Sequence, residues 1–231
     1  MKNIVITGAA RGMGKAIAEK FALPGHRLIL CSKTETRLAQ TAEWLKQSKA
    51  EVHFFAADLT VLKEVKAFAR FSLAWGAPFI LINNAGTYVP GNCIDEPEGN
   101  LEFMLKTNLF SAYELTRALV AAMIENKQGH IFNISSIAGL QAYPGGGGYS
   151  ISKFAMRGFT ENLRQELMNK NIKVTGVYPG AVFTDSWACF DNSENRIMLP
   201  ADIADMIFAA SQLSPAAVVE DIIIRPQQGD L

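Results

Sequence analysis

The sequence has few of the residues that hold extracellular or metal-binding proteins together. Among its 231 residues there are only three cysteines, Cys31, Cys93 and Cys189. Their number is odd, their spacing is unpaired and no CxxC motif occurs, so we expect reduced thiols in a cytoplasmic protein rather than disulfides. The histidines are as few, and they are scattered in the sequence: His26, His53 and His130. Metal ligands usually cluster, so we expect no metal site.

No segment has the apolar length of a membrane span or a secretion signal. The first residues, MKNIVITGAA, run straight into a strand pattern. The longest apolar runs, such as ALVAAMI at 118–124, are far too short to cross a bilayer.

Charge is balanced as well, because Lys+Arg and Asp+Glu both count 22. That balance gives no sign of a nucleic-acid binder or a membrane-surface protein, so we expect a small molecule as the partner.

What the chain does have is enough apolar residues for one sizeable core. Hydrophobic residues make up 49% of the sequence, which disfavours disorder. Short apolar runs typical of strands occupy residues 3–7, 27–31, 51–57, 79–83, 130–135, 173–178 and 221–225. Helical patterns lie between them, at about 13–23, 34–48, 60–74, 99–124, 149–170 and 200–213.

The alternation of these elements predicts the fold class. Several of the strands are apolar at consecutive positions, which is typical of strands that helices cover on both faces. Strand–helix alternation of this kind indicates a parallel, doubly wound sheet. We therefore predict an α/β protein with a single-domain Rossmann fold over residues 1–231: seven parallel strands with helices on both faces.

A glycine-rich turn follows the first predicted strand at once. The segment TGAARGMG carries Gly8, Gly12 and Gly14 and leads straight into a helical pattern. Positions without side chains let the backbone approach a pyrophosphate closely, and the N–H groups at the start of the next helix point toward the anion. A turn with no ligand and a site for S-adenosylmethionine are the alternatives, and the glycine spacing disfavours the second. The strand before the turn and the helix after it favour a dinucleotide.

The end of the second predicted strand distinguishes between the two dinucleotides. An NAD site usually has a carboxylate there, which accepts from the ribose 2′-hydroxyl. This chain has Ser32 and Lys33 instead, and Arg11 in the glycine turn adds a second cation. A 2′-phosphate would meet a hydroxyl and positive charge, so NADP(H) is favoured. Solvated surface charges at Lys33 and Arg11 are the alternative, and nearby Glu35 keeps NAD(H) possible.

Five motifs together resemble one protein family. TGAARGMG, NNAG at 83–86, NISSIAG at 133–139, YSISK at 149–153 and PGAVFT at 179–184 occur in the order and spacing of the short-chain dehydrogenase/reductase family. The resemblance covers nearly the whole chain. Any one of these motifs arises easily by chance, whereas five in register are specific.

The resemblance implies four catalytic residues: Asn108, Ser136, Tyr149 and Lys153. Tyr149 would deliver the proton and Ser136 would hold the substrate oxygen. Lys153, one helical turn from Tyr149, would bind the nicotinamide ribose, and Asn108 would hold a water that connects it to solvent. Of two adjacent serines, Ser136 stands thirteen residues before the tyrosine, as in the family, and Ser135 is interpreted as its neighbour.

The YSISK motif also carries a physical expectation. An ordinary phenol has a pKa of about 10 and is a poor proton donor or acceptor at neutral pH. A cation within a few ångströms favours the phenolate, so we expect Lys153 to lower the pKa of Tyr149. On its own, YxxxK would more often be a helix start with the tyrosine packed and the lysine in water. The other four motifs favour the catalytic interpretation.

The resemblance implies a cofactor-binding set as well: Gly8, Arg11, Gly12, Met13, Gly14, Ser32, Lys33, Asp58, Leu59, Asn84, Ala85, Gly86, Tyr149, Lys153, Pro179, Gly180, Val182 and Thr184. In the family, the segment after the fourth strand lines the adenosine, and the turn after the sixth holds the nicotinamide carboxamide. Asp58 matches an acid that accepts from the adenine amino group. We expect Thr60 to cap the next helix and to leave Asp58 free for that role.

Two segments near the predicted site are specific to this chain. Four successive glycines, 145–148, are more than the family pattern usually has there. We hypothesise a mobile wall of the substrate pocket, and a surface loop without a role is the alternative.

Residues 185–200 occupy the place of the substrate lid and are few, so we expect an open site. Trp187 and Phe190 would either stack on a substrate or, as we favour, pack on the sheet edge.

The sequence thus predicts an NADP(H)-dependent oxidoreductase that interconverts a ketone and a secondary alcohol by hydride transfer. Candidate substrates are 3-oxoacyl thioesters, pterin side-chain ketones of the sepiapterin type, and small xenobiotic or sugar ketones. The alternatives are an NADP(H) redox sensor without turnover, which usually lacks the tyrosine or lysine, and an epimerase or dehydratase, which is typically longer. By resemblance, helices 99–124 and 149–170 pair across a two-fold axis, so a homodimer or homotetramer is expected.

Overall fold

The computed structural model describes residues 1–187 and 190–230, which contain a sheet of seven strands in the order β3-β2-β1-β4-β5-β6-β7. All neighbouring strands are parallel. The strands are β1 (Lys2–Thr7), β2 (His26–Ser32), β3 (Glu51–Ala56), β4 (Ile80–Asn83), β5 (Gly129–Ile134), β6 (Ile172–Pro179) and β7 (Asp221–Ile224). The predicted strands are confirmed, each to within one residue at either end.

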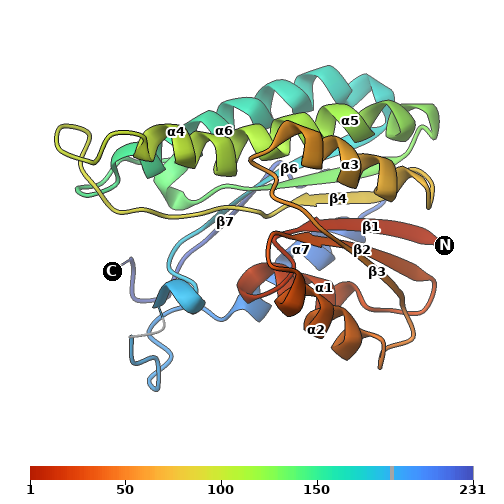
Figure 1. The fold of residues 1–231 in the computed structure, drawn as a ribbon, viewed down its shortest axis with the longest axis horizontal. Coiled ribbons are helices and arrows are strands. Elements are labelled where there is room, and N and C mark those ends of the chain that lie inside the picture. Colours follow the sequence, from red (N-terminus) through yellow and green to blue (C-terminus); the bar gives the residue numbers. More distant parts are fainter. Residues whose placement is uncertain (188–189, 231) are drawn as a thin grey trace.

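Helices cover both faces of the sheet, as predicted (Figure 1). One face carries α3 (Leu62–Leu73), α4 (Asn100–Leu105), α5 (Ser111–Glu125) and α6 (Gly147–Leu167). The other face carries α1 (Gly12–Phe21), α2 (Glu35–Leu45) and α7 (Pro200–Ser211). This arrangement is the doubly wound Rossmann fold that the sequence predicts. Within the part of the chain that the structure describes, every helix is too short or too polar to cross a membrane.

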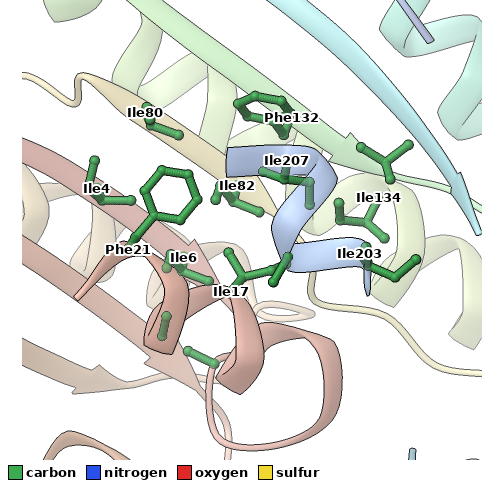
Figure 2. Close-up of a cluster of buried hydrophobic side chains, with 14 of the residues drawn as sticks. Ile4, Ile6, Ile17, Phe21, Ile80, Ile82, Phe132, Ile134, Ile203 and Ile207 are labelled. Carbon is green, nitrogen blue, oxygen red and sulfur yellow. The ribbon is translucent and has the colours of Figure 1, made fainter. Parts of the chain in front are cut away.

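The core forms two apolar layers, one on each face of the sheet. β4 is buried at every position, which explains why its sequence is apolar without alternation. Figure 2 shows one layer, where Ile17 and Phe21 of α1 and Ile203 and Ile207 of α7 cover the sheet. The opposite layer is formed mainly by α3, α5 and α6 against the same strands. Burial on both faces fixes the sheet and therefore the positions of its strand ends.

The helix predicted over 99–124 is not continuous. α4 and α5 are separated by η1 (Lys106–Phe110), a turn of π-helix. Asn108 lies in this turn and is fully buried. Its amide accepts from the Thr87 N–H at 2.7 Å and donates to the Thr87 carbonyl at 3.0 Å. These bonds tie the turn to the segment after β4, and π-turns of this kind are frequent at functional sites.

The order of the strands creates a crevice between β1 and β4. From β1 the chain winds outward to β2 and β3, and it then returns to β4 on the other side of β1. The loops after β1 and β4 therefore leave the sheet in opposite directions. Ligands of such sheets bind at this point, outside the carboxyl ends of the strands. The glycine turn 7–14 and the NNAG segment 83–86 both lie there.

A buried histidine in β5 links the stability of the fold to pH. Nε2 of His130 lies 2.7 Å from the Thr175 hydroxyl, which donates its own proton to the Val219 carbonyl at 2.6 Å. The imidazole therefore donates from Nε2. Burial, with a smaller contribution from the charge of Lys173, lowers the pKa of His130 to about 3.

We expect this histidine to destabilise the fold as the pH falls below about 6.5, the pKa of a histidine in an unfolded chain. Between that pH and about 3 the unfolded chain binds the proton and the folded chain does not. The free energy of unfolding should therefore fall by about 1.4 kcal/mol per pH unit from this residue alone. Denaturant unfolding of the wild type and His130→Gln should give a difference that shrinks toward acid pH. A difference that stays constant with pH would contradict the prediction.

Candidate active site

A cavity of about 410 Å³ opens at the carboxyl ends of β1, β2, β3 and β4, and this volume is ordinary for a small-molecule site. Thirteen residues of the predicted cofactor set line it: Gly8, Arg11, Gly12, Met13, Gly14, Ser32, Lys33, Asp58, Leu59, Asn84, Ala85, Gly86 and Thr184. Five residues of that set are not part of its lining: Tyr149, Lys153, Pro179, Gly180 and Val182. Among the residues that the structure describes, no three His, Cys, Asp or Glu side chains gather as a metal site requires.

The glycine turn has the shape that a pyrophosphate needs. Gly8 and Gly12 have positive φ values of 65° and 52°, which other residues adopt only with strain. A Cβ at Gly14 would collide with the Gly8 carbonyl and with the Asn84 amide. α1 begins at Gly12, and Arg11 at its N-cap makes no side-chain capping bond. The first N–H groups of α1 therefore stay available to an anion.

Thr7 joins the two loops of the crevice. Its hydroxyl accepts from the backbone N–H groups of Asn84 and Ala85, at 3.0 and 2.9 Å. The same hydroxyl donates to the Ile82 carbonyl at 3.3 Å, and the Asn84 amide donates to the Thr7 carbonyl at 2.9 Å. These bonds hold the glycine turn and the NNAG segment at a fixed separation, so both line one cavity.

Three cations stand where the cavity meets the end of β2. Lys33 pairs with Asp58 at 2.7 Å, and Arg11 pairs with Asp185 at 2.5 Å. Arg37 of α2 lies 3.6 Å from Asp185. The hydrogen bond to Asp58 raises the pKa of Lys33, and the hydrogen bond from Arg11 lowers the pKa of Asp185. This part of the cavity is therefore arranged to receive an anion, with carboxylates as the present partners of the cations.

Asp58 is not free, contrary to the expectation. α3 begins at Leu62 with Val61 as its N-cap and has no side-chain capping bond, so Thr60 does not cap it. The Asp58 carboxylate instead accepts from the N–H and the hydroxyl of Thr60, at 3.0 and 2.7 Å. Burial acts to raise the pKa of Asp58, but hydrogen bonds from Lys33 and Thr60 outweigh burial and hold that pKa below its ordinary value. Thr60 serves a tight turn after β3 rather than the helix.

The two adjacent serines at the end of β5 have different partners. Ser135 is buried, and its hydroxyl donates to the Lys153 carbonyl at 3.0 Å. Ser136 precedes the short helix η2 (Ile137–Gly139), and its hydroxyl accepts from the Ala138 N–H at 3.2 Å. Of the two serines, Ser136 is the one that acts on the pKa of the predicted acid, Tyr149, which agrees with its choice over Ser135.

Tyr149 and Lys153 lie side by side near the start of α6. The Lys153 ammonium is 5.7 Å from the centroid of the Tyr149 ring and donates to the Ile134 carbonyl at 3.1 Å. Burial lowers the pKa of Lys153 to about 8. Burial also raises the pKa of Tyr149, and the hydrogen bond with Ser136 only partly opposes it. The prediction of a lowered Tyr149 pKa is therefore wrong for this structure. Desolvation of the phenol has the larger effect on its pKa, and the Lys153 ammonium makes its hydrogen bond to the backbone.

Asn108 reaches this pair through Ser152. The Asn108 amide donates to the Ser152 hydroxyl at 2.9 Å, and that hydroxyl donates to the Tyr149 carbonyl at 2.7 Å. Gly86 fits between the two predicted relay residues. A Cβ there would lie 3.3 Å from Oδ1 of Asn108 and 3.6 Å from Nζ of Lys153. The structure thus brings the four predicted catalytic residues together beside Gly86, which lines the cavity.

The turn after β6 joins the site at two points. Thr184 lines the cavity directly. The Pro179 carbonyl accepts from the Ser136 hydroxyl at 3.4 Å. Val182 forms an isolated parallel bridge with Met198, which closes the base of the predicted lid. The turn therefore contacts both the cavity and Ser136, the serine predicted to be catalytic.

The four-glycine run at the start of α6 is packed against the loop after β4. Gly145 and Gly147 have positive φ values of 79° and 36°. A Cβ at Gly147 would collide with the Gly91 carbonyl. The Glu96 carboxylate accepts from the Gly148 N–H at 3.3 Å. Close backbone packing gives these glycines a structural reason, and the mobile wall stays a hypothesis.

In the predicted lid, Trp187 and Phe190 pack on each other. Their ring centroids are 5.5 Å apart at an interplanar angle of 78°. The structure shows this mutual contact, and packing of the two rings on the sheet edge stays a prediction. Residues 188–189 of the lid lie outside the residues that the structure describes.

Nine residues line the cavity without having been predicted: Ala10, Thr34, Arg37, Ala57, Thr60, Phe103, Thr107, Ser111 and Asp185. Arg37 follows Lys33 by one helical turn, a spacing that could have indicated it. Asp185 directly follows Thr184 but carries no motif of its own. Phe103, Thr107 and Ser111 recur every four residues, so they share one face of the helical segment.

The chain matches proteins of one family over its length. A family model described as short chain dehydrogenase matches residues 2–195. The chain is also similar to a sepiapterin reductase of Chlorobaculum tepidum. The two are 34% identical over 241 residues, which cover 100% of this chain and 99% of that protein.

Two solved structures share the fold. One is a metagenomic short-chain oxidoreductase in complex with NADP, 30% identical with a TM-score of 0.86, covering 98% of this chain and 97% of that one. The other is an alcohol dehydrogenase from the archaeon Thermococcus sibiricus complexed with 5-hydroxy-NADP, 26% identical with a TM-score of 0.90, covering 100% and 99%. Sequence and structure therefore point to the same group of proteins.

Proposed function

Because the chain belongs to the short chain dehydrogenase family, we propose that this oxidoreductase interconverts a ketone and a secondary alcohol with NADP(H). One cluster carries the proposal. Ser136 lies close enough to Tyr149 to act on the pKa of its phenol, and the Lys153 ammonium lies 5.7 Å from the centroid of the Tyr149 ring. The cluster adjoins Gly86, which lines the cavity with the glycine turn. A proton donor, an oxyanion-stabilising hydroxyl and a dinucleotide-shaped cavity are the parts that carbonyl reduction needs.

Each residue has a task that its surroundings support. Tyr149, kept protonated by its raised pKa, donates a proton to the carbonyl oxygen. Ser136 donates a hydrogen bond to the same oxygen as negative charge develops there. Lys153, whose pKa of about 8 lies near neutrality, returns a proton to the phenol. Asn108, which lies in the π-turn, would hold the water through which Lys153 regains its proton from solvent.

NADP(H) fits the residues of the cavity. The free N–H groups of α1 suit a pyrophosphate, and Arg11, Lys33 and Arg37 suit a 2′-phosphate. When bound, NADPH supplies the hydride. Similarity to solved complexes with NADP and 5-hydroxy-NADP adds support. NADH has no 2′-phosphate to pair with these three cations.

Consumption of NADPH with a panel of ketones tests the proposal directly. The panel should include aryl, alkyl and cyclic ketones, a sugar ketone, a 3-oxoacyl thioester and sepiapterin, with NADH in parallel. We expect turnover with at least one ketone and faster turnover with NADPH. Tight NADPH binding without turnover of any member would favour a redox sensor instead.

Similarity to a sepiapterin reductase makes a pterin side-chain ketone one proposed substrate.

We also propose that residues 185–200 are the substrate lid. Arg196 supports this assignment because it donates to the carbonyls of Gly229 and Asp230, at 3.0 and 3.4 Å. These bonds anchor the end of the lid to the C-terminal segment. The substrate would bind between the lid and Tyr149.

We propose a homodimer or homotetramer built on α5 and α6, which lie in one outer layer (Figure 1). The support is a set of large apolar side chains on this layer, each between 39% and 49% exposed: Phe110, Tyr113, Ile151 and Phe154. Such side chains gathered on one layer mark protein interfaces more often than free surface.

A charge in this layer should separate the subunits. We expect wild type to elute with at least twice the monomer mass of 25.2 kDa and Phe154→Glu to elute as the monomer in light-scattering chromatography. The reason is that an unpaired carboxylate inside an apolar interface is poorly solvated. Trp44→Glu, at an exposed aromatic of α2 on the other face, is the control and should not change the mass. A wild type of 25.2 kDa would refute the proposal.

We propose a cytoplasmic location, as the thiols suggest. Cys31 is a buried free thiol, and Cys93 is an exposed one. Burial raises the pKa of Cys31 above its ordinary value, which keeps the thiol protonated. Cys189 lies outside the residues that the structure describes. Free thiols at these positions are compatible with a reducing compartment.

A further inference from the structure

Two tyrosines beside the catalytic cluster stand outside every motif. We propose that Tyr88 and Tyr143, the tyrosine wall, select ketones that carry a flat aromatic or conjugated group next to the carbonyl. The inference rests on the proposed function and adds a substrate class to it. Tyr88 comes from the loop after β4, and Tyr143 comes from the loop between η2 and α6.

The tyrosine wall contacts Tyr149, the proposed proton donor. The ring of Tyr88 packs edge-to-face on the ring of Tyr149, with centroids 4.9 Å apart and an interplanar angle of 81°. Burial raises the pKa of Tyr143, and the nearby phenols of Tyr88 and Tyr149 add to that rise, so Tyr143 is a neighbour of both. Three phenol rings from two loops and one helix therefore stand side by side.

Backbone bonds hold both loops in place. The Gly91 N–H donates to the Gly145 carbonyl at 3.2 Å, which joins the loop of Tyr88 to the loop of Tyr143. The Gly146 N–H donates to the Tyr143 carbonyl at 3.1 Å. A Cβ at Gly146 would lie 3.0 Å from the Tyr143 ring, so the glycine run leaves room for that ring. The tyrosine wall is thus positioned before a substrate arrives.

Both rings of the tyrosine wall are open to a ligand. Tyr88 is 45% exposed and Tyr143 is 42% exposed. A carbonyl oxygen that accepts from Tyr149 and Ser136 has little freedom, so a substituent on one side of the carbonyl must lie along Tyr88. Aromatic rings prefer other flat π-systems in offset or edge-on contact over saturated groups of equal size. The lid pair Trp187 and Phe190 is already occupied by its mutual contact.

A matched pair of ketones tests the wall. Acetophenone and cyclohexyl methyl ketone have the same carbon skeleton and differ in the aromaticity of the ring. We expect wild type to favour acetophenone in kcat/KM, and we expect Tyr88→Leu and Tyr143→Leu to reduce that preference by about 10-fold. Tyr88→Phe, which keeps the ring, should retain the preference within about 2-fold. Trp44→Leu removes an exposed aromatic of α2 and should change nothing.

The outcomes separate the wall from the proposed function. Equal loss of kcat/KM for both ketones in Tyr88→Leu, with NADPH binding and thermal stability retained, would overturn the wall alone. An unchanged ratio in both leucine variants would overturn it as well. A wild type that binds NADPH and reduces no ketone would overturn the proposed function and the wall with it.

Discussion

Replacing Tyr149 with phenylalanine should lower kcat for ketone reduction by roughly 10²–10⁴-fold and leave NADPH affinity within about 3-fold of wild type. The variant keeps the ring and its edge-to-face contact with Tyr88, so the start of α6 should stay in place. Only the phenol hydroxyl, which Ser136 influences, is lost. Because Tyr149 does not line the cavity, cofactor binding should be spared. Single-turnover kinetics and a fluorescence titration with NADPH measure the two quantities separately.

Tyr113→Phe is the matched control for this variant. Tyr113 packs on Phe159 at a centroid distance of 5.3 Å, outside the cavity lining, so removing its hydroxyl should leave kcat within about 2-fold. Parallel losses of turnover and NADPH affinity in Tyr149→Phe would assign Tyr149 a structural role. Full turnover in that variant would remove Tyr149 from the chemistry altogether.

The parts of the fold that depend on local pattern could be predicted from the sequence. Strands buried on both faces have continuous apolar runs, as in ILIN of β4, and their alternation with helices predicted a doubly wound parallel sheet. The glycine turn was equally predictable, because positive φ at Gly8 and Gly12 admits few residues other than glycine. The residues predicted to bind the cofactor at the ends of β1 to β4 line one cavity, and their role in binding stays a prediction.

Features that depend on contacts distant in sequence could not be predicted. The π-turn at Asn108 is defined by backbone hydrogen bonds between residues five apart, and the types of its side chains do not reveal those bonds. The pKa of Tyr149 rises because burial outweighs the neighbouring lysine, and burial is a property of the folded chain. The contact between Tyr88 and Tyr149 joins segments that no spacing rule relates.

Removing two of the cations near the end of β2 should change the choice between NADPH and NADH. We expect Lys33→Ala with Arg37→Ala to weaken NADPH binding by about 100-fold or more and to change NADH binding by less than about 3-fold, because each charge-assisted bond to a phosphate contributes about 1.5–3 kcal/mol. Only NADPH carries the 2′-phosphate. Lys15→Ala, which removes a cation paired with Glu19 outside the cavity lining, is the control. Equal weakening for both cofactors would mean that the cations support the fold instead.

Asp185, the carboxylate beside Arg11 and Arg37, allows a second test in which NADPH binding should become tighter instead of weaker. Asp185 lies 2.5 Å from Arg11 and 3.6 Å from Arg37, so it competes with any phosphate for both guanidinium groups. Asp185→Asn removes that competition and should tighten NADPH binding several-fold, with little effect on NADH. Both effects should weaken as salt concentration rises, because the charges are exposed. Tighter NADPH binding in Asp185→Asn, together with weaker binding in the Lys33→Ala, Arg37→Ala double variant, would identify electrostatics at this end of the cavity as the basis of cofactor choice. Weaker NADPH binding in both variants would mean that Asp185 helps to build the site.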